Sequence, residues 1–175
     1  MFKQLNTLVS TTIIVASLSV SAVMAHGDEI NHHLTMKNAT QYSSQYITGG
    51  QPSIKDLQEL SRNDLKVVVN LRGEGEFGEF DEKEVVDSLG MTYISIPVSG
   101  AGEVNFENVA KFNAALKKGT DKTLVHCASG NRVGAFFALK AFKYDGKSAD
   151  ESLKIGKAAG LTSLEGKVKA LMSEH

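Results

Sequence analysis

The sequence has a single cysteine and lacks any long run of charge of one sign. With Cys127 as the only cysteine among 175 residues, no disulfide can form within the chain. Nineteen basic residues nearly balance twenty acidic ones, which gives a net charge of −1 and a pI near 6.5. Nucleic-acid binding relies on clustered positive charge, so this balance argues against a nucleic-acid partner.

The first 25 residues have the pattern of a secretory signal peptide. Lys3 provides a weak positive start, an apolar stretch runs from Leu8 to Val23, and small residues precede a cleavage site after Ala25. We therefore expect a periplasmic or secreted protein that is not attached to the membrane after cleavage. The alternative is an uncleaved anchor, because the apolar stretch is near the lower length limit for a membrane span. No cysteine lies directly after this stretch, at the position where a lipoprotein signal would need one, which excludes a lipoprotein.

The remaining chain is long enough for one domain with its own core. Residues 26–45 are polar and are predicted to form a flexible N-terminal segment, and residues 46–175 the domain. Apolar runs and amphipathic stretches alternate along the domain, which predicts an α/β fold: a central, mostly parallel sheet of about four to five strands flanked by helices. Strands are expected at 46–48, 65–71, 91–98 and 122–126, and helices from 53 and over 82–89, 106–119, 132–144, 149–159 and 163–172.

One stretch carries most of the chemical information. An apolar strand ends at His126-Cys127, a short loop with Gly130 follows, and Arg132 opens a helical run. This geometry points backbone N–H groups and the helix dipole into one small concavity that favours an anion and stabilises a thiolate. A free cysteine is commonly a buried, inert residue. Here its neighbours His126, Gly130 and Arg132 favour a nucleophile that faces an anionic substrate.

Four segments together resemble a known family. They are residues 46–53 (YITGGQPS), 69–72 (VNLR), 93–98 (YISIPV) and 124–132 (LVHCASGNR). In this order they resemble the bacterial phosphatase-like domain that is also found fused to β-lactamase-like hydrolases. That domain is similar in fold to dual-specificity and tyrosine phosphatases. The resemblance extends from about residue 46 to residue 161, and it implies a phosphatase.

The resemblance also implies roles for individual residues. Cys127 would form a thiophosphate intermediate, Arg132 would bind two phosphoryl oxygens with its guanidinium fork, and His126 would orient the loop and help to keep Cys127 ionised. Backbone N–H groups would hold the rest of the anion; these belong to Ala128, Ser129, Gly130, Asn131 and Arg132.

Three features depart from the phosphatase pattern. Only four residues separate Cys127 from Arg132, where these phosphatases have five; four is typical of rhodanese-like sulfurtransferases. Val133 stands where phosphatases place a hydroxyl residue. Their Asp general acid is absent after the strand that ends at Val98, and the nearest acid is Glu103, a candidate for that role or a surface residue. Two alternatives to the phosphatase therefore stay open: persulfide transfer on Cys127, or a non-catalytic anion-binding module.

The loop after the second strand of the domain offers one more candidate. Arg72 lies at the carboxyl end of that strand, where it could contact the anion or pair with Glu74 or Glu76. The carboxylates Glu74, Glu76 and Glu79 are interpreted as a solvated loop rather than a metal site. We expect no cofactor and no metal, and a small anionic partner: a phosphate ester or a sulfur donor.

Overall fold

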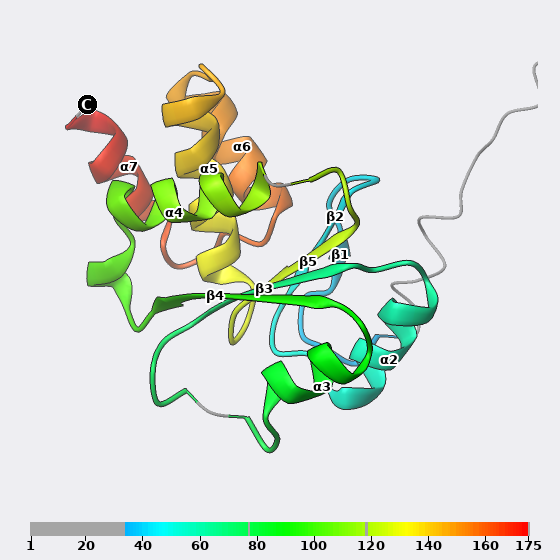
Figure 1. Ribbon diagram of the computed structural model, residues 1–175. Helices are drawn as coiled ribbons and strands as arrows, with labels where there is room; N and C mark the ends of the chain where they lie inside the picture. Colours follow the sequence, from blue (N-terminus) through cyan, green and yellow to red (C-terminus); the bar gives the residue numbers. More distant parts are fainter. Residues whose placement is uncertain (1–33, 77, 118, 175) are drawn as a thin grey trace, which may run out of the picture.

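The chain folds into an α/β sandwich with one sheet between two layers of helices (Figure 1). A computed structural model describes residues 34–76, 78–117 and 119–174, so the predicted signal peptide lies outside the described residues. The strands are β1 (Thr40–Gln41), β2 (Tyr46–Gly49), β3 (Val67–Arg72), β4 (Thr92–Val98) and β5 (Thr123–His126). The helices are α2 (Ile54–Arg62), α3 (Glu82–Ser88), α4 (Phe106–Leu116), α5 (Asn131–Tyr144), α6 (Ala149–Ala158) and α7 (Glu165–Ser173), with a 3-10 turn η1 (Ala101–Glu103).

The sheet has the strand order β1-β2-β5-β3-β4. Strands β2, β5, β3 and β4 run parallel, and β1 pairs antiparallel with β2 at the edge. This confirms the predicted mostly parallel sheet. Because β5 lies in the middle, its last residue, His126, is in register with Gly49 on β2 and with Asn70 on β3. The chain that follows β5 therefore starts from the centre of the carboxyl edge.

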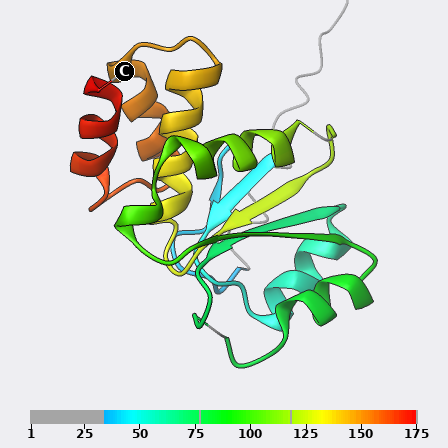
Figure 2. The same cartoon turned by 60° about the vertical axis from the view of Figure 1, so that its left-hand side comes forward.

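Each strand sends alternate side chains to opposite faces of the sheet. One face packs under α4, α5 and α7, where Val69 and Val125 join a core with Phe112 and Phe136. The other face packs under α2 and α3, where Val68 and Leu124 contact a second apolar cluster that includes Leu57, Leu60 and Val86. Figures 1 and 2 show the two helical layers on opposite sides of the sheet.

The later part of the predicted N-terminal segment, residues 34–45, is described by the structure, whereas residues 26–33 lie outside the described ranges. Residues 34–45 are docked on the domain: β1 pairs with β2, so that Thr40 lies opposite Thr48, and Met36 is buried. The backbone N–H of Gly50 donates to the carbonyl of Lys37 at 2.7 Å. This docking uses backbone hydrogen bonds, which a polar sequence forms as readily as an apolar one. The polar composition of residues 26–45 therefore gave no sign of it.

Two local features fix how helices join the sheet. Ser53 and Asp56 form a capping box at the start of α2, the helix that the sequence predicts from residue 53. Gly134 lets α5 approach α6 closely, because a Cβ there would lie 1.9 Å from the backbone nitrogen of Leu161. None of the helices in the described ranges is long and apolar enough to cross a membrane.

Candidate functional site

The loop between β5 and α5 has the predicted strand–loop–helix geometry. β5 ends at His126, and α5 begins at Asn131 after the N-cap residue Gly130. Gly130 has φ +91°, a left-handed conformation that glycine adopts without strain, and it turns the chain sharply into the helix. Its backbone N–H donates to the Sγ atom of Cys127 at 3.1 Å. The cysteine sulfur is thus held at the helix N-terminus, where the helix dipole favours negative charge.

Cys127 faces the layer of α4 and α5. Its exposed fraction is 1%, and it belongs to the same apolar core as Val125 and Val133. Arg132, on the first turn of α5, interacts electrostatically with this thiol. The structure therefore brings together the two residues to which the sequence assigned the chemistry.

The guanidinium of Arg132 is held by two other groups. Its two terminal nitrogens donate to the two carboxylate oxygens of Glu76 at 2.5 and 2.6 Å, and one of them also donates to the carbonyl of Val98 at 2.5 Å. The side chains of Arg132 and Glu76 are 14% and 30% exposed. The hydrogen bond with Glu76 raises the pKa of Arg132, with a smaller contribution from its interaction with Cys127, and the same bond lowers the pKa of Glu76.

This pair corrects the interpretation of the Gly/Glu-rich loop. The sequence predicted that Glu76 is solvated or paired with Arg72, but its carboxylate is bound to Arg132. A bidentate, partly buried pair of this kind is more stable than an exposed single contact between neighbouring side chains. Arg72 instead donates to the side-chain oxygen of Gln51 at 2.5 Å, and no ion pair of Arg72 with Glu74 or Glu76 is present in the described chain.

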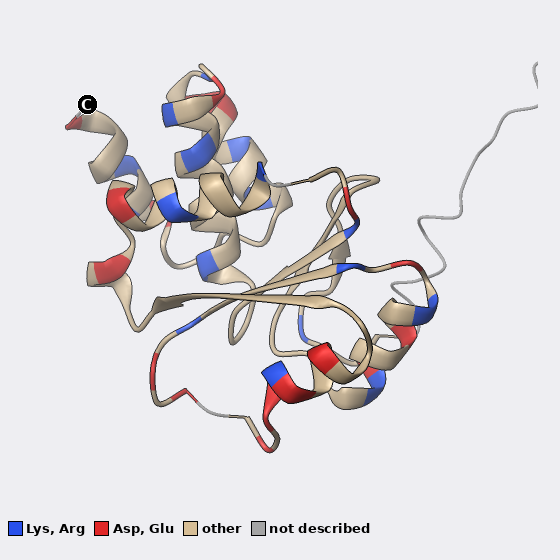
Figure 3. Ribbon diagram, in the orientation of Figure 1, with Lys and Arg blue, Asp and Glu red and all other residues tan. Residues whose placement is uncertain are grey.

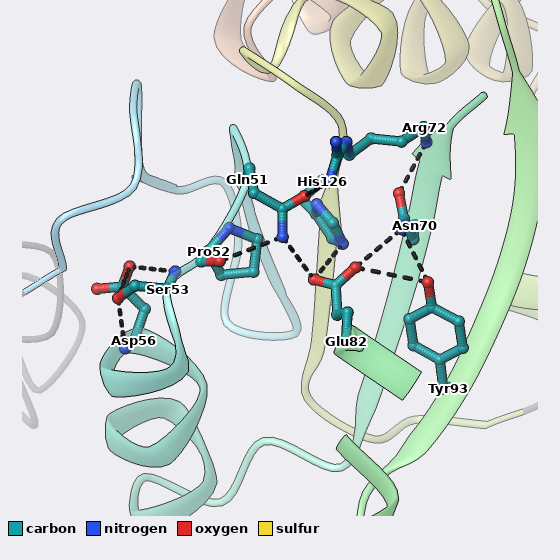
Figure 4. Close-up of polar contacts among 9 residues, drawn as sticks. All are labelled: Gln51, Pro52, Ser53, Asp56, Asn70, Arg72, Glu82, Tyr93 and His126. Atoms are coloured by element: carbon teal, nitrogen blue, oxygen red, sulfur yellow. Dashed lines mark hydrogen bonds and ion pairs between the residues drawn. The ribbon is translucent and has the colours of Figure 1, made fainter. Parts of the chain in front are cut away.

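His126 faces the opposite layer, toward α2 and α3, because it alternates with Cys127 along the chain (Figure 4). Its Nε2 atom lies 3.1 Å from Oε1 of Glu82, with exposed fractions of 0% and 7% for the two side chains. The contact has the distance of an ion pair but not the angle of a hydrogen bond, since neither ring nitrogen has a hydrogen-bond partner among the described residues. Glu82 stands at the start of α3, so this contact ties that helix to the end of β5.

Glu82 is also the centre of a buried polar network. Asn70 donates from its side-chain nitrogen to Glu82 at 2.8 Å and to the hydroxyl of Tyr93 at 2.8 Å, and Gln51 donates to Glu82 at 3.2 Å. Burial, assisted by the charge of Glu82, raises the pKa of Tyr93. Figure 4 shows these side chains converging from β3, β4, α3 and the loop after β2.

Sequence reasoning missed Glu82, Asn70 and Tyr93. One signal was present: Asn70 is a polar residue inside the apolar strand run of residues 67–71. A buried polar side chain needs hydrogen-bond partners, so its position predicts a polar network on that face. The identity of the partners was not visible, because Glu82 and Tyr93 lie on other elements.

Comparison with known proteins assigns the family. Residues 20–167 match a family model described as DSP-PTPase phosphatase fused to NAD+ kinase. The chain belongs to this family. The domain is therefore a phosphatase-like domain of the cysteine-dependent type, as the resemblance implied.

Its similarity to curated proteins covers only part of each. A β-lactamase hydrolase-like protein of Agrobacterium fabrum is 29% identical over 58% of this chain and 24% of its own length. A protein of the same description from Xylella fastidiosa is 28% identical over 63% of this chain and 26% of its own length. The chain thus spans about a quarter of the curated relatives that it matches.

Solved structures agree with the fold. A candidate phosphatase (DUF442) from Shewanella putrefaciens is 25% identical, with a TM-score of 0.63 over 83% of this chain and 94% of that one. A Neisseria meningitidis candidate phosphatase, 18% identical, has a TM-score of 0.63 over 77% and 96% of the two chains. Both support the α/β fold described above.

Not all site residues named from the sequence meet at the loop between β5 and α5. The side chain of Asn131 is engaged elsewhere: it donates to the hydroxyl of Ser163 at 2.7 Å and accepts from the backbone N–H of Thr162 at 2.8 Å. Ala128 and Ser129 are exposed, and the carbonyl of Ser129 accepts a hydrogen bond from Asn38 at 2.8 Å. Their backbone N–H groups, like that of Gly130, remain the predicted anion donors.

Glu103 and Arg72 lie outside this cluster. The carboxylate of Glu103 accepts a hydrogen bond from the backbone N–H of Ser99, and its side chain is exposed in η1. Neither Glu103 nor Arg72 has a contact with Cys127 or Arg132 in the described part of the chain. The predicted contributions of these two residues therefore stay predictions.

A cavity of about 580 Å³ adjoins the Glu76–Arg132 pair. It is lined by the Gly/Glu-rich loop, the start of α3 and the outer part of β4, with Arg72, Glu76, Lys83 and Tyr93 among its residues. Figure 3 shows acidic residues gathered along this loop and on α3. Glu76 lines the cavity, whereas Arg132 and Cys127 do not. No group of three or more potential metal ligands occurs among the residues that the structure describes.

Proposed function

We propose that the domain hydrolyses a phosphate monoester with Cys127 as the nucleophile. The observation that carries this proposal is the hydrogen bond from the N–H of Gly130 to Sγ of Cys127, at the start of α5 and beside Arg132. A donor, a helix N-terminus and a cation around one sulfur atom stabilise the thiolate form. A stabilised thiolate beside anion-binding N–H groups is suited to attack phosphorus.

The reaction then has two displacement steps. In the first, a bond forms between Sγ of Cys127 and phosphorus while the bond from phosphorus to the leaving oxygen breaks, and that oxygen takes up a proton. In the second, water attacks phosphorus, the S–P bond breaks, and the thiolate and inorganic phosphate are released. The guanidinium of Arg132 would bind two phosphoryl oxygens in both steps.

The substrate class follows from the same geometry. The anion donors accept a small anionic ester, and a Pseudomonas aeruginosa relative in fold, TpbA, was solved in complex with phosphotyrosine. We extend this to the chain as a phosphate ester of a small or peptide-borne alcohol. The location of the reaction, periplasmic or extracellular, rests on the signal-peptide pattern of residues 1–25, and it is tested by determining the N-terminus of the exported protein.

The test uses the mature chain from His26, fully reduced, with an aryl phosphate. We expect turnover by the wild-type protein, a loss of at least about a thousandfold in Cys127→Ser, and retained binding of vanadate by that variant. Ser173→Ala, at the exposed end of α7, is the matched control and is expected to keep full activity.

The same preparation tests the second candidate function, sulfur transfer. The four-residue spacing between Cys127 and Arg132 favours this alternative. Thiosulfate is added, and the intact mass is measured before and after cyanide. No turnover of any aryl phosphate, together with a gain of one sulfur atom on Cys127 that cyanide removes, would overturn the phosphatase in favour of sulfur transfer. Tight anion binding with neither reaction would leave a binding module.

A further inference from the structure

The reaction proposed above needs a proton for the leaving oxygen, and the structure offers one well-placed donor. Phosphatases similar to this domain carry an acid just after the strand that corresponds to β4, but residues 99–102 contain no carboxylate. Glu103, the nearest acid in sequence, is bound to the backbone of Ser99. In the described ranges, Glu76 is the only carboxylate with a contact to residues 127–132.

We propose that Glu76 is a catalytic residue that leaves Arg132 when the phosphoryl group binds and then protonates the leaving oxygen. This inference rests on the proposed phosphatase function. Both oxygens of Glu76 lie on the two terminal nitrogens of Arg132, at 2.5 and 2.6 Å. A phosphoryl group needs the same two N–H donors, so substrate and Glu76 compete for one guanidinium fork.

The competition explains how an ionised carboxylate becomes an acid. In the free protein the hydrogen bond from Arg132 outweighs burial and, with the N–H of Gly73, lowers the pKa of Glu76. When the phosphoryl group takes Arg132, this stabilisation is lost and a dianion lies next to the carboxylate. Like charge at short range raises the proton affinity of a carboxylate. Glu76 therefore takes up a proton when, and because, the substrate binds.

Several charged groups surround Glu76, and those that line the same cavity include Glu79, Asp81, Glu82 and Lys83. Arg132 faces it from α5, Arg72 acts on it from β3, and the Cys127 thiol lies behind Arg132; β4 contributes the carbonyl of Val98 to the same guanidinium. Glu76 is partly exposed and lines the cavity beside the loop. The proposed step requires the Glu76 side chain to rotate from Arg132 toward the leaving oxygen of the bound ester.

The test separates proton donation from a role in holding Arg132. Glu76→Gln keeps the shape of the side chain but has no proton to give. With a dinitrophenyl phosphate, whose leaving group needs no proton, we expect kcat within about threefold of wild type. With phenyl phosphate, whose leaving group needs one, we expect a loss of about a hundredfold or more. The alkaline limb of the wild-type pH–rate profile should be absent in this variant. Glu74→Gln, exposed in the same loop, is the matched control and should behave like wild type on both esters.

Binding of inorganic phosphate gives a second readout that does not depend on turnover. A neutral amide competes less well for Arg132, so Glu76→Gln should bind phosphate several-fold more tightly than wild type, as measured by calorimetry. Weaker phosphate binding, or an equal loss of kcat on both esters, would show that Glu76 only positions Arg132 and would overturn the proposal. So would a leaving-group dependence that appears in Glu103→Gln instead.

The two proposals fail in different ways. If the wild-type protein hydrolyses no ester, the proposed function is wrong, and the proton donor with it. If the wild-type protein is active and Glu76→Gln equals or exceeds it on phenyl phosphate, the phosphatase stands and the assignment of Glu76 is wrong.

Discussion

At the carboxyl ends of β3 and β5, the two faces of the sheet are packed differently: one face is apolar, and the other carries a buried polar network. Under α4 and α5, Leu71 near the end of β3 and Cys127 directly after β5 are packed in an apolar core with Phe112 and Phe136. Under α2 and α3, the neighbouring residues Asn70 and His126 meet a buried polar network around Glu82.

Two kinds of interaction therefore position the loop between β5 and α5: apolar packing on one face of the sheet and hydrogen bonding on the other. Apolar packing is non-directional, so the α5 face fixes the position of Cys127 but tolerates changes of side-chain shape. Hydrogen bonds and ion pairs are directional, and a buried polar group that loses its partner is costly. The network face therefore sets the orientation of the strand ends on which the loop begins. Substitutions on the two faces should accordingly differ in their tolerance.

The largest expected effect is at the close contact between α5, which covers the packed face, and α6 with the residues that follow it. In Gly134→Ala the new Cβ would lie 1.9 Å from the nitrogen of Leu161 and 2.6 Å from the carbonyl oxygen of Gly156, and backbone atoms cannot rotate away. Overpacking usually costs about 1–3 kcal/mol, and we expect a loss at or above the top of this range in urea unfolding followed by circular dichroism. Gly166→Ala on α7, where a Cβ meets no atom within 4 Å, should leave stability unchanged or raise it. Equal stability of the two variants would contradict the close helix approach.

An intermediate loss of stability is expected for Glu82→Gln, and it tests the difference between the two faces. Glu82→Gln keeps the size of the side chain, but one amide oxygen cannot serve Asn70, Gln51 and His126 together. We expect a loss of about 2 kcal/mol in the free energy of unfolding. The comparable conservative change on the packed face, Leu139→Met, should cost less than about 1.5 kcal/mol. If Glu82→Gln lost less free energy of unfolding than Leu139→Met, the polar network around Glu82 would not be what stabilises that face of the sheet.

The smallest effect is pH-dependent and concerns the start of α2. Burial would raise the pKa of Asp56, but hydrogen bonds from Ser53 and Thr35 outweigh it and hold the pKa below its usual value. A carboxylate with a lowered pKa stabilises the fold above its unfolded value, about 3.9, and this contribution is lost as the pH falls through the folded value. Asp56→Asn should therefore cost about 1 kcal/mol at pH 7 and less at pH 3. Urea unfolding of both proteins at the two pH values measures this, and a difference that grows in acid would contradict it.

Sequence reasoning was most successful where the relevant residues are neighbours along the chain. The strand that ends at His126, the turn at Gly130 and the helix from Asn131 are contiguous, so apolar periodicity and one glycine were enough to place them. The same holds for the capping box of Ser53 and Asp56, which is a spacing of three residues.

Sequence reasoning failed for contacts between residues that are far apart along the chain. Glu76 binds Arg132 across 56 residues, and Glu82 at the start of α3 contacts His126 at the end of β5. The sequence shows three glutamates in one Gly-rich loop with nothing to distinguish them. Only the packing of that loop against α5 selects Glu76 and leaves Glu74 and Glu79 exposed.

The sequence by itself thus determined the fold class, the family and the loop that holds Cys127, because periodicity, turn residues and a compact motif are local properties of a chain. The tertiary structure decided what occupies the guanidinium of Arg132 and what surrounds His126. Those partners depend on which side chains the folded sheet and its helices bring within hydrogen-bond distance, and burial then makes the contacts strong enough to matter.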